Sequence, residues 1–159
     1  MTIPEASQRV VEAGRLLGFE VDVHWFPEGT KTSQDAADAI GCELSAIAKS
    51  IVLTLDDKEQ VVVFASGDTR IDLELLAHAA GATSARRATL DEARAATGFA
   101  AGGTPPFGYS GRPLRVFADV ALRRHIDVWS AGGTPTTVFP IPLQTLVDLT
   151  GATWVEATE

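Results

Sequence analysis

The stretch Ser45–Leu53, SAIAKSIVL, decides the fold because it begins a buried strand and places a lysine at the mouth of that strand. Ile51, Val52 and Leu53 form an apolar run of the kind that makes a buried strand. Lys49 comes just before this run, although a buried charge without a partner is costly. The lysine is either a side chain whose ammonium group reaches solvent or a cation held at a functional site.

A second apolar run follows this strand after a polar turn. Residues 56–60, DDKEQ, are typical of a turn, and Val61–Ser66 then returns as another strand. The two runs together predict a β-hairpin.

The rest of the chain alternates between helical and extended patterns. Apolar spacing, cap signals and closing glycines predict helices within residues 10–17, 32–40, 73–79, 89–97 and 143–147. Further strands are predicted at residues 19–26, 114–120, 126–131 and 137–141. Because these elements interleave, we expect an α/β fold: one compact domain over residues 1–159, with a mixed β-sheet flanked by helices.

Composition excludes several classes of protein. The chain has 159 residues, of which 45% are hydrophobic and 21% charged, as in an ordinary globular domain. Its longest apolar runs are too short to span a bilayer and its start lacks a secretory signal, so no membrane association is expected. Cys42 is the only cysteine, which fits a cytoplasmic location, and the Cys and His spacing predicts no metal site and no cofactor.

The net charge of −8 argues against binding to long duplex DNA, where Lys and Arg supply most of the affinity. The same net charge is compatible with contact to a short nucleic-acid end through a local basic patch. The candidate patches are three arginine pairs, which are otherwise solvated surface: Arg86 with Arg87, Arg112 with Arg115, and Arg123 with Arg124.

Two features stand out as candidates for chemistry. One is Lys49, and the other is the segment GGTPPFG, residues 102–108, whose glycines allow backbone N–H groups to point at one place. The same segment is also compatible with a rigid structural turn. Cys42 with His24 or His78 is a further candidate nucleophile, although a lone cysteine is more often a small core residue.

These motifs follow one another in an order that resembles a known family. The order T-x-x-x-A-A-x-x-I-G, I-A-K-S-I-V-L, A-T-G-F-x-x-G-G-x-P-P-F-G, D-V-W-S-A-G and D-L-T-G-A is similar to that of the YbaK-like aminoacyl-tRNA deacylases. This family is related to the inserted editing domain of bacterial prolyl-tRNA synthetase. The resemblance covers residues 32–152.

The resemblance implies an enzyme that hydrolyses the ester of a mischarged tRNA in trans, often tRNA(Pro). Lys49 matches the residue most closely tied to activity, and Gly102 and Gly103 match a glycine pair that lines the ester-binding cleft. The N–H groups of this pair are expected to stabilise the oxyanion. Lys49 is expected to orient the substrate while water or a substrate group attacks, with a role as general base left open.

The resemblance also implies a set of binding residues. The expected substrate contacts are Trp25, Phe26, Thr32, Ser50, Thr104, Pro105, Phe107, Gly108, Ala131, Gly132 and Thr137. Arg112 and Arg115, just beyond the glycine loop, are expected to contact tRNA. The amino acid removed is expected to be small, such as Ala, Ser, Thr or Cys. Residues 130–139, SAGGTPTTVF, lack the charges found in some cysteine-directed relatives, so cysteine specificity is not carried over.

Two alternatives remain beside the editing enzyme. A non-catalytic module would use the same cleft to bind tRNA 3′ ends, nucleotides or a synthetase, with prolyl-tRNA synthetase as the candidate partner. A cysteine hydrolase built on Cys42 would be sensitive to alkylation and would lose activity in Cys42→Ala.

Overall fold

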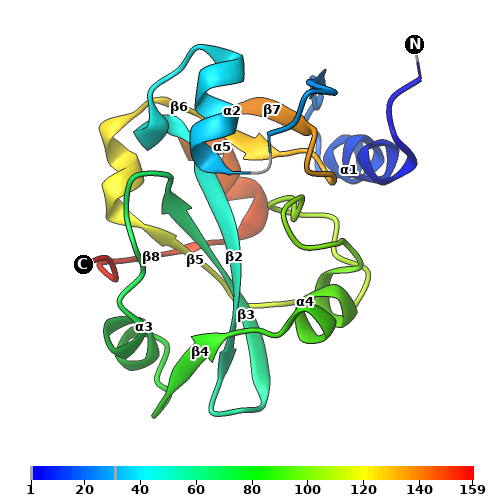
Figure 1. Cartoon of the computed structure of the whole chain (residues 1–159). Coiled ribbons are helices and arrows are strands. Elements are labelled where there is room, and N and C mark those ends of the chain that lie inside the picture. Colours follow the sequence, from blue (N-terminus) through cyan, green and yellow to red (C-terminus); the bar gives the residue numbers. More distant parts are fainter. Residues whose placement is uncertain (1, 31) are drawn as a thin grey trace.

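The computed structural model describes residues 2–30 and 32–159 and contains two β-sheets with helices packed around them (Figure 1). In spatial order, the five-stranded sheet holds β4 (Ala85–Arg87), β2 (Ala48–Leu55), β3 (Glu59–Ser66), β5 (Val116–Asp119) and β8 (Thr153–Val155). The three-stranded sheet holds β1 (His24–Trp25), β7 (Thr137–Pro142) and β6 (Asp127–Ala131). The α-helices are α1 (Glu5–Leu16), α2 (Ser33–Ile40), α3 (Leu73–Ala79), α4 (Leu90–Thr97) and α5 (Leu143–Thr150). Two 3₁₀ helices, η1 (Leu44–Ala46) and η2 (Val120–Arg124), complete the fold.

The predicted α/β class is confirmed, and the predicted hairpin is the centre of the larger sheet. β2 and β3 pair antiparallel from Ala48 opposite Ser66 to Leu55 opposite Glu59. β5 and β8 add to this sheet in parallel, so the sheet is mixed as expected. None of the helices in the described residues is long and apolar enough to cross a membrane.

The structure differs from the sequence prediction in three places. The strand predicted at residues 19–26 is reduced to the two residues of β1. The strands β4 and β8, with three residues each, were not predicted. β6 and β7 pair as a second hairpin, but this hairpin belongs to a separate antiparallel sheet. A parallel bridge joins Trp129 of this sheet to Ile47, the residue just before β2.

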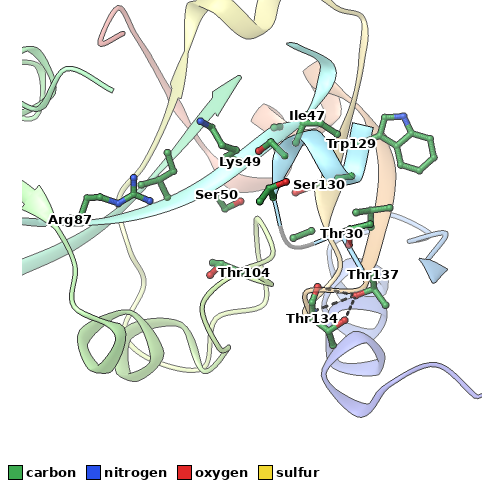
Figure 2. A pocket seen from close by; sticks show the side chains of 18 residues that line it. Thr30, Ile47, Lys49, Ser50, Arg87, Thr104, Trp129, Ser130, Thr134 and Thr137 are labelled. Atoms are coloured by element: carbon green, nitrogen blue, oxygen red, sulfur yellow. Dashed lines mark hydrogen bonds between the residues drawn. The ribbon is translucent and has the colours of Figure 1, made fainter. Parts of the chain in front are cut away.

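Side chains of β2 alternate between two hydrophobic cores, one on each face of the larger sheet. Val52 joins the core that also contains Phe64 and Phe139, whereas Leu53 joins the core that contains Leu76 of α3. Because neighbouring residues of a strand point to opposite faces, Lys49 and Ser50 leave β2 in opposite directions, as Figure 2 shows.

Glu92 at the start of α4 fixes the position of β4. The Thr89 hydroxyl accepts from the Glu92 N–H, and Glu92 accepts from the Thr89 N–H in return, which forms the predicted capping box. The same carboxylate receives two hydrogen bonds from Arg86 of β4, at 2.7 and 2.9 Å. The Arg86 guanidinium, together with the Thr89 N–H, lowers the pKa of Glu92 to about 2.

Glu92→Gln is expected to lower the stability of the protein at neutral pH but not in strong acid. The folded-state pKa lies below the ordinary value of about 4.3, so the stabilisation is complete above that value and is lost as the pH falls toward 2. Urea unfolding midpoints at pH 7, 4 and 3 measure this, with Asp91→Asn on the same exposed turn as the control. A difference from wild type that did not shrink with decreasing pH would contradict it.

Candidate functional site

A cavity of about 240 Å³ opens at the free edge of β2. β4 pairs only with Leu53–Leu55, and β6 touches the chain at Ile47, so residues 48–52 lie between these two contacts. The cavity is lined by Thr30, Thr32, Ser33, Ala36, Ile47, Ala48, Lys49, Ser50, Ile51, Arg87, Gly102, Thr104, Trp129, Ser130, Ala131, Thr134, Thr137 and Val138 (Figure 2). The lining thus comes from β2, β4, α2 with the residues before it, the glycine loop and the β6–β7 hairpin.

Lys49 is a half-buried cation held by a backbone carbonyl. Its Nζ donates a 2.9 Å hydrogen bond to the carbonyl oxygen of Thr69. Burial lowers the pKa of Lys49, and the positive charges of Arg87 and Arg70 lower it further, whereas Asp68 opposes the shift. The ammonium group is therefore only partly solvated and is fixed in direction, which suits a group that meets an incoming ligand.

The glycine loop approaches the β6–β7 turn too closely for a side chain. A Cβ on Gly103 would lie 2.5 Å from the Cα and carbonyl carbon of Thr134. The Gly103 N–H donates to the Ala100 carbonyl at 3.3 Å. Among the described residues, the N–H groups of Gly102 and Thr104 have no acceptor, and both residues line the cavity. Gly102 and Thr104 are thus the residues of this loop that both line the cavity and carry an unpaired N–H group.

Hydroxyl groups make up most of the polar lining. The side-chain oxygens of Ser50 and Ser130 are buried and have no hydrogen-bond partner among the described residues. At the start of β7, the Thr137 hydroxyl lies 2.8 Å from that of Thr134 and accepts from Ser7 of α1 at 3.1 Å. Since buried polar groups are normally paired, the Ser50 and Ser130 hydroxyls are unused hydrogen-bonding groups in the lining of this cavity.

The structure brings together many of the residues singled out from the sequence. Those that line the cavity are Thr32, Lys49, Ser50, Gly102, Thr104, Ala131 and Thr137. Those outside its lining are Trp25, Phe26, Gly103, Pro105, Phe107, Gly108, Gly132, Arg112 and Arg115. Phe107 lies in the core and Phe26 packs beside Ile47 and Val138, so both act in packing.

Arg112 and Arg115 lie at the other end of the larger sheet. Arg115 forms an ion pair with Glu59, next to the β2–β3 turn, and donates to the Ala80 carbonyl. Arg112 lines a different hollow together with Lys58 and Glu59. The expected tRNA contact through this pair is therefore separated from the cavity that contains Lys49.

Among the lining residues that were not predicted as site residues are Thr30, Arg87, Trp129 and Ser130. Ser130 and Trp129 lie in the D-V-W-S-A-G motif, and Arg87 belongs to one of the arginine pairs noted in the sequence. Trp129 takes the place at the cavity wall that was expected for Trp25 or Phe26. The motif could therefore have identified Ser130 as a site residue. The residues around Arg86 and Arg87 give no reason to choose one of the two arginines over the other.

Cys42 lies outside this lining and packs with Ile47 and Val138. Burial raises the pKa of its thiol, and the charge of Glu43 raises it further. A raised pKa disfavours the nucleophilic thiolate, so the structure does not favour the cysteine hydrolase. Among the described residues, no group of three His, Cys, Asp or Glu side chains is placed to hold a metal ion.

Comparisons with known proteins place these features in a family. Residues 27–149 match the aminoacyl-tRNA editing domain. The chain is 30% identical to the YwhH protein of Bacillus subtilis over 138 residues, which is 86% of this chain and 87% of that protein. It is 26% identical over 152 residues to the "Putative Cys-tRNA(Pro)/Cys-tRNA(Cys) deacylase EbsC" of Enterococcus faecalis, covering 96% and 92% of the two chains. A crystal structure of "a putative trans-editing enzyme for prolyl tRNA synthetase" matches with a TM-score of 0.92 and 35% identity over 99% of both chains.

Proposed function

Because the chain belongs to the aminoacyl-tRNA editing domain family, we propose that it hydrolyses the ester bond of mischarged aminoacyl-tRNA in trans. The proposed substrate is tRNA(Pro), or a related tRNA, that carries a small amino acid such as Ala, Ser, Thr or Cys. The reaction would take place in the cytoplasm, where tRNA is charged, with prolyl-tRNA synthetase as the candidate partner. The observation that carries the proposal is the meeting of Lys49, the glycine loop and Ser130 in one small cavity.

Lys49 is proposed to orient the substrate by binding an oxygen of the terminal nucleotide or of the aminoacyl carbonyl. Its fixed direction supports this role, because preorganised charges stabilise developing charge without reorganisation. The N–H groups of Gly102 and Thr104 are the available donors for the oxyanion. For Gly103 to serve as a donor, its N–H would have to leave the Ala100 carbonyl.

The lining residues include no carboxylate and no histidine, so no ordinary general base is present among them. For hydrolysis, this supports attack by a water or hydroxyl that the substrate itself activates, or by water activated by deprotonated Lys49. The same observation also favours the second candidate, a non-catalytic module that binds charged tRNA ends in this cavity.

The test is deacylation of tRNA(Pro) charged with Ala, Ser, Thr, Cys or Pro. Release of one or two of these amino acids that is faster than spontaneous hydrolysis supports the enzyme and names its substrate. Tight binding of a charged tRNA without release supports the binding module. Neither release nor binding with any of the five contradicts both.

Ser130→Ala is expected to weaken substrate binding while leaving the protein as stable as wild type, or more stable. The Ser130 hydroxyl is buried and unpaired in the free protein, so its removal relieves a desolvation cost. If the substrate supplies its missing partner, KM for the charged tRNA rises about tenfold. Deacylation kinetics and thermal unfolding on the same samples measure the two effects.

The matched control is Thr150→Ala, which removes a partly exposed hydroxyl that is already bonded to the Leu146 carbonyl in α5. This control is expected to lose some stability and no activity. Loss of stability in Ser130→Ala with unchanged KM would show that the hydroxyl acts in packing rather than in substrate binding.

A further inference from the structure

A second cavity, of about 320 Å³, lies on the other side of Lys49. Its lining is Lys49, Ile51, Leu53, Thr69, Arg70, Ile71, Leu73, Arg87 and Glu159. Lys49, Ile51 and Arg87 line both cavities, so the two spaces adjoin along the free edge of β2. Figure 2 shows Lys49 and Arg87 extending from neighbouring strands, β2 and β4.

The second cavity is cationic. The lining holds three cations, Lys49, Arg70 and Arg87, and one carboxylate side chain, Glu159. Both arginines lower the pKa of Lys49, whereas Asp68, which lies outside the lining and is paired with Arg124, raises it. Among the described residues, the hydrogen bonds of Arg70 and Arg87 are made by their backbone groups, and neither side chain has a partner. Positive charges thus outnumber the one carboxylate side chain in this lining, and the nearby Asp68 is already paired with Arg124. An anion bound among the three cations would relieve their repulsion.

The segment that carries Arg70 is held firmly in place. Asp68 forms an ion pair with Arg124 at 2.7 Å, and Thr69 accepts the hydrogen bond from Lys49. The Arg70 carbonyl accepts from the Glu159 N–H at 3.0 Å, and Ile71 pairs with Thr158. The backbone on which Arg70 stands is therefore fixed relative to Lys49, as a preformed binding site requires.

We propose that this second cavity binds the phosphodiester group that precedes the terminal nucleoside of the aminoacyl-tRNA. At the end of such a tRNA, the ester, the terminal ribose and the first backbone phosphate follow one another. The hydroxyl-rich part of the first cavity, then Lys49, and then the cationic cavity follow in the same order. Arginine is well suited to phosphate because its planar fork donates two parallel hydrogen bonds.

This assignment rests on the proposed function and explains how a chain of net charge −8 holds an RNA end. Only one or two phosphates are engaged, so the salt dependence of binding is expected to be shallow. For single strands, the slope of log K against log salt is about −0.7 per phosphate. Removal of one contact should lower this slope measurably.

The experiment measures binding of the uncharged trinucleotide CCA by titration calorimetry at several salt concentrations. Arg70→Gln is expected to weaken binding about tenfold and to flatten the salt dependence. The control is Arg94→Gln, which removes the same charge from an exposed position on α4 outside both cavities. Glu159→Gln, which removes the one carboxylate, is expected to tighten binding.

Equal effects of Arg70→Gln and Arg94→Gln would overturn the proposal. The proposal would also be overturned if inorganic phosphate bound as tightly as CCA and its binding depended equally on Arg70. The cavity would then be a site for a free anion. The arrangement predicts instead that the trinucleotide binds more tightly, since its terminal nucleoside reaches the first cavity.

Kinetics separate this proposal from the proposed function. With charged tRNA, the loss of kcat/KM in Arg70→Gln is expected to exceed the loss with the aminoacyl ester of adenosine, which has no phosphate, by about tenfold. If no substrate is hydrolysed but CCA binding still depends on Arg70, the hydrolase is rejected and the phosphate site is retained. Normal hydrolysis with equal losses on both substrates would reject the phosphate site alone.

Discussion

Lys49→Ala is expected to lower kcat/KM for the charged tRNA by about 10²–10³-fold, the cost of removing one preorganised electrostatic contact from an active site. Lys49 lies at the junction of the two cavities, so its removal affects both the orientation of the ester and the binding of the neighbouring anion. Single-turnover deacylation of the preferred charged tRNA measures the loss. Lys58→Ala, in the exposed β2–β3 turn, is the control and should remain near wild type.

The pH dependence distinguishes the two roles of Lys49. Because burial and neighbouring arginines lower its pKa, the ammonium form is lost at a lower pH than for an ordinary lysine. If the charged form orients the substrate, kcat/KM falls as the pH rises through this pKa, and Lys49→Arg removes that fall. If the neutral amine is the base, kcat/KM rises over the same range and Lys49→Arg is inactive. A wild-type activity that Lys49→Ala reduced by only a few-fold would reject both roles.

Gly103→Ala is expected to lower activity about 100-fold and to destabilise the fold by roughly 1–3 kcal/mol, the usual cost of overpacking. The new Cβ would meet the backbone of Thr134 at 2.5 Å, and a backbone cannot rotate away as a side chain can. The glycine loop must therefore shift relative to the β6–β7 turn. A displacement of about 1 Å in a positioned group is enough for a loss of this size.

Gly81→Ala is the matched control for this variant. Gly81 has a positive φ of 76°, and a Cβ there would meet nothing within 4 Å. Its substitution adds backbone strain far from the cavity, so stability should fall while kcat/KM stays unchanged. Equal activity losses in the two variants, measured where both are folded, would show that the loop has no special role.

Much of the fold could be predicted from the sequence because helix caps and hairpins are determined by interactions between residues that are close in the chain. The capping boxes at Thr32 and Thr89, and the left-handed glycines Gly41 and Gly98 that end the same two helices, depend only on residues a few positions away. The β2–β3 hairpin was equally accessible, since its two apolar strands are joined by one short polar turn.

The arrangement of the site depends on pairing between distant segments, which is why sequence adjacency misplaced Arg115. This residue follows the glycine loop closely in the chain, but it precedes β5, which runs parallel to β3. Lys49 lies opposite Ala65, near the end of β3, whereas Arg115 reaches Glu59 at its beginning. The parallel pairing therefore carries the arginine to the opposite end of the sheet.

Arg87, in contrast, was not predicted as a site residue but lines the cavity. Its strand has only three residues, too few for a recognisable alternation, and an arginine pair by itself resembles ordinary solvated surface. Only the pairing of β4 with β2, together with the contacts of Arg86 to Glu92, shows that Arg87 faces the cavities.

The hydrogen bond of Ser7 bears on which part of the chain must be included when this domain is transferred to another protein. Ser7 is fully buried in α1 and bonds Thr137, and a Cβ on Gly133 of the adjoining turn would meet the Ala6 carbonyl of the same helix at 2.9 Å. This helix lies before the first residue that matches the family. A chimera that contained only residues 27–149 would thus include the cavity but lack α1, the helix that packs against its β6–β7 turn. The unit to transplant therefore begins at α1, some twenty residues before the start of the match to the family model.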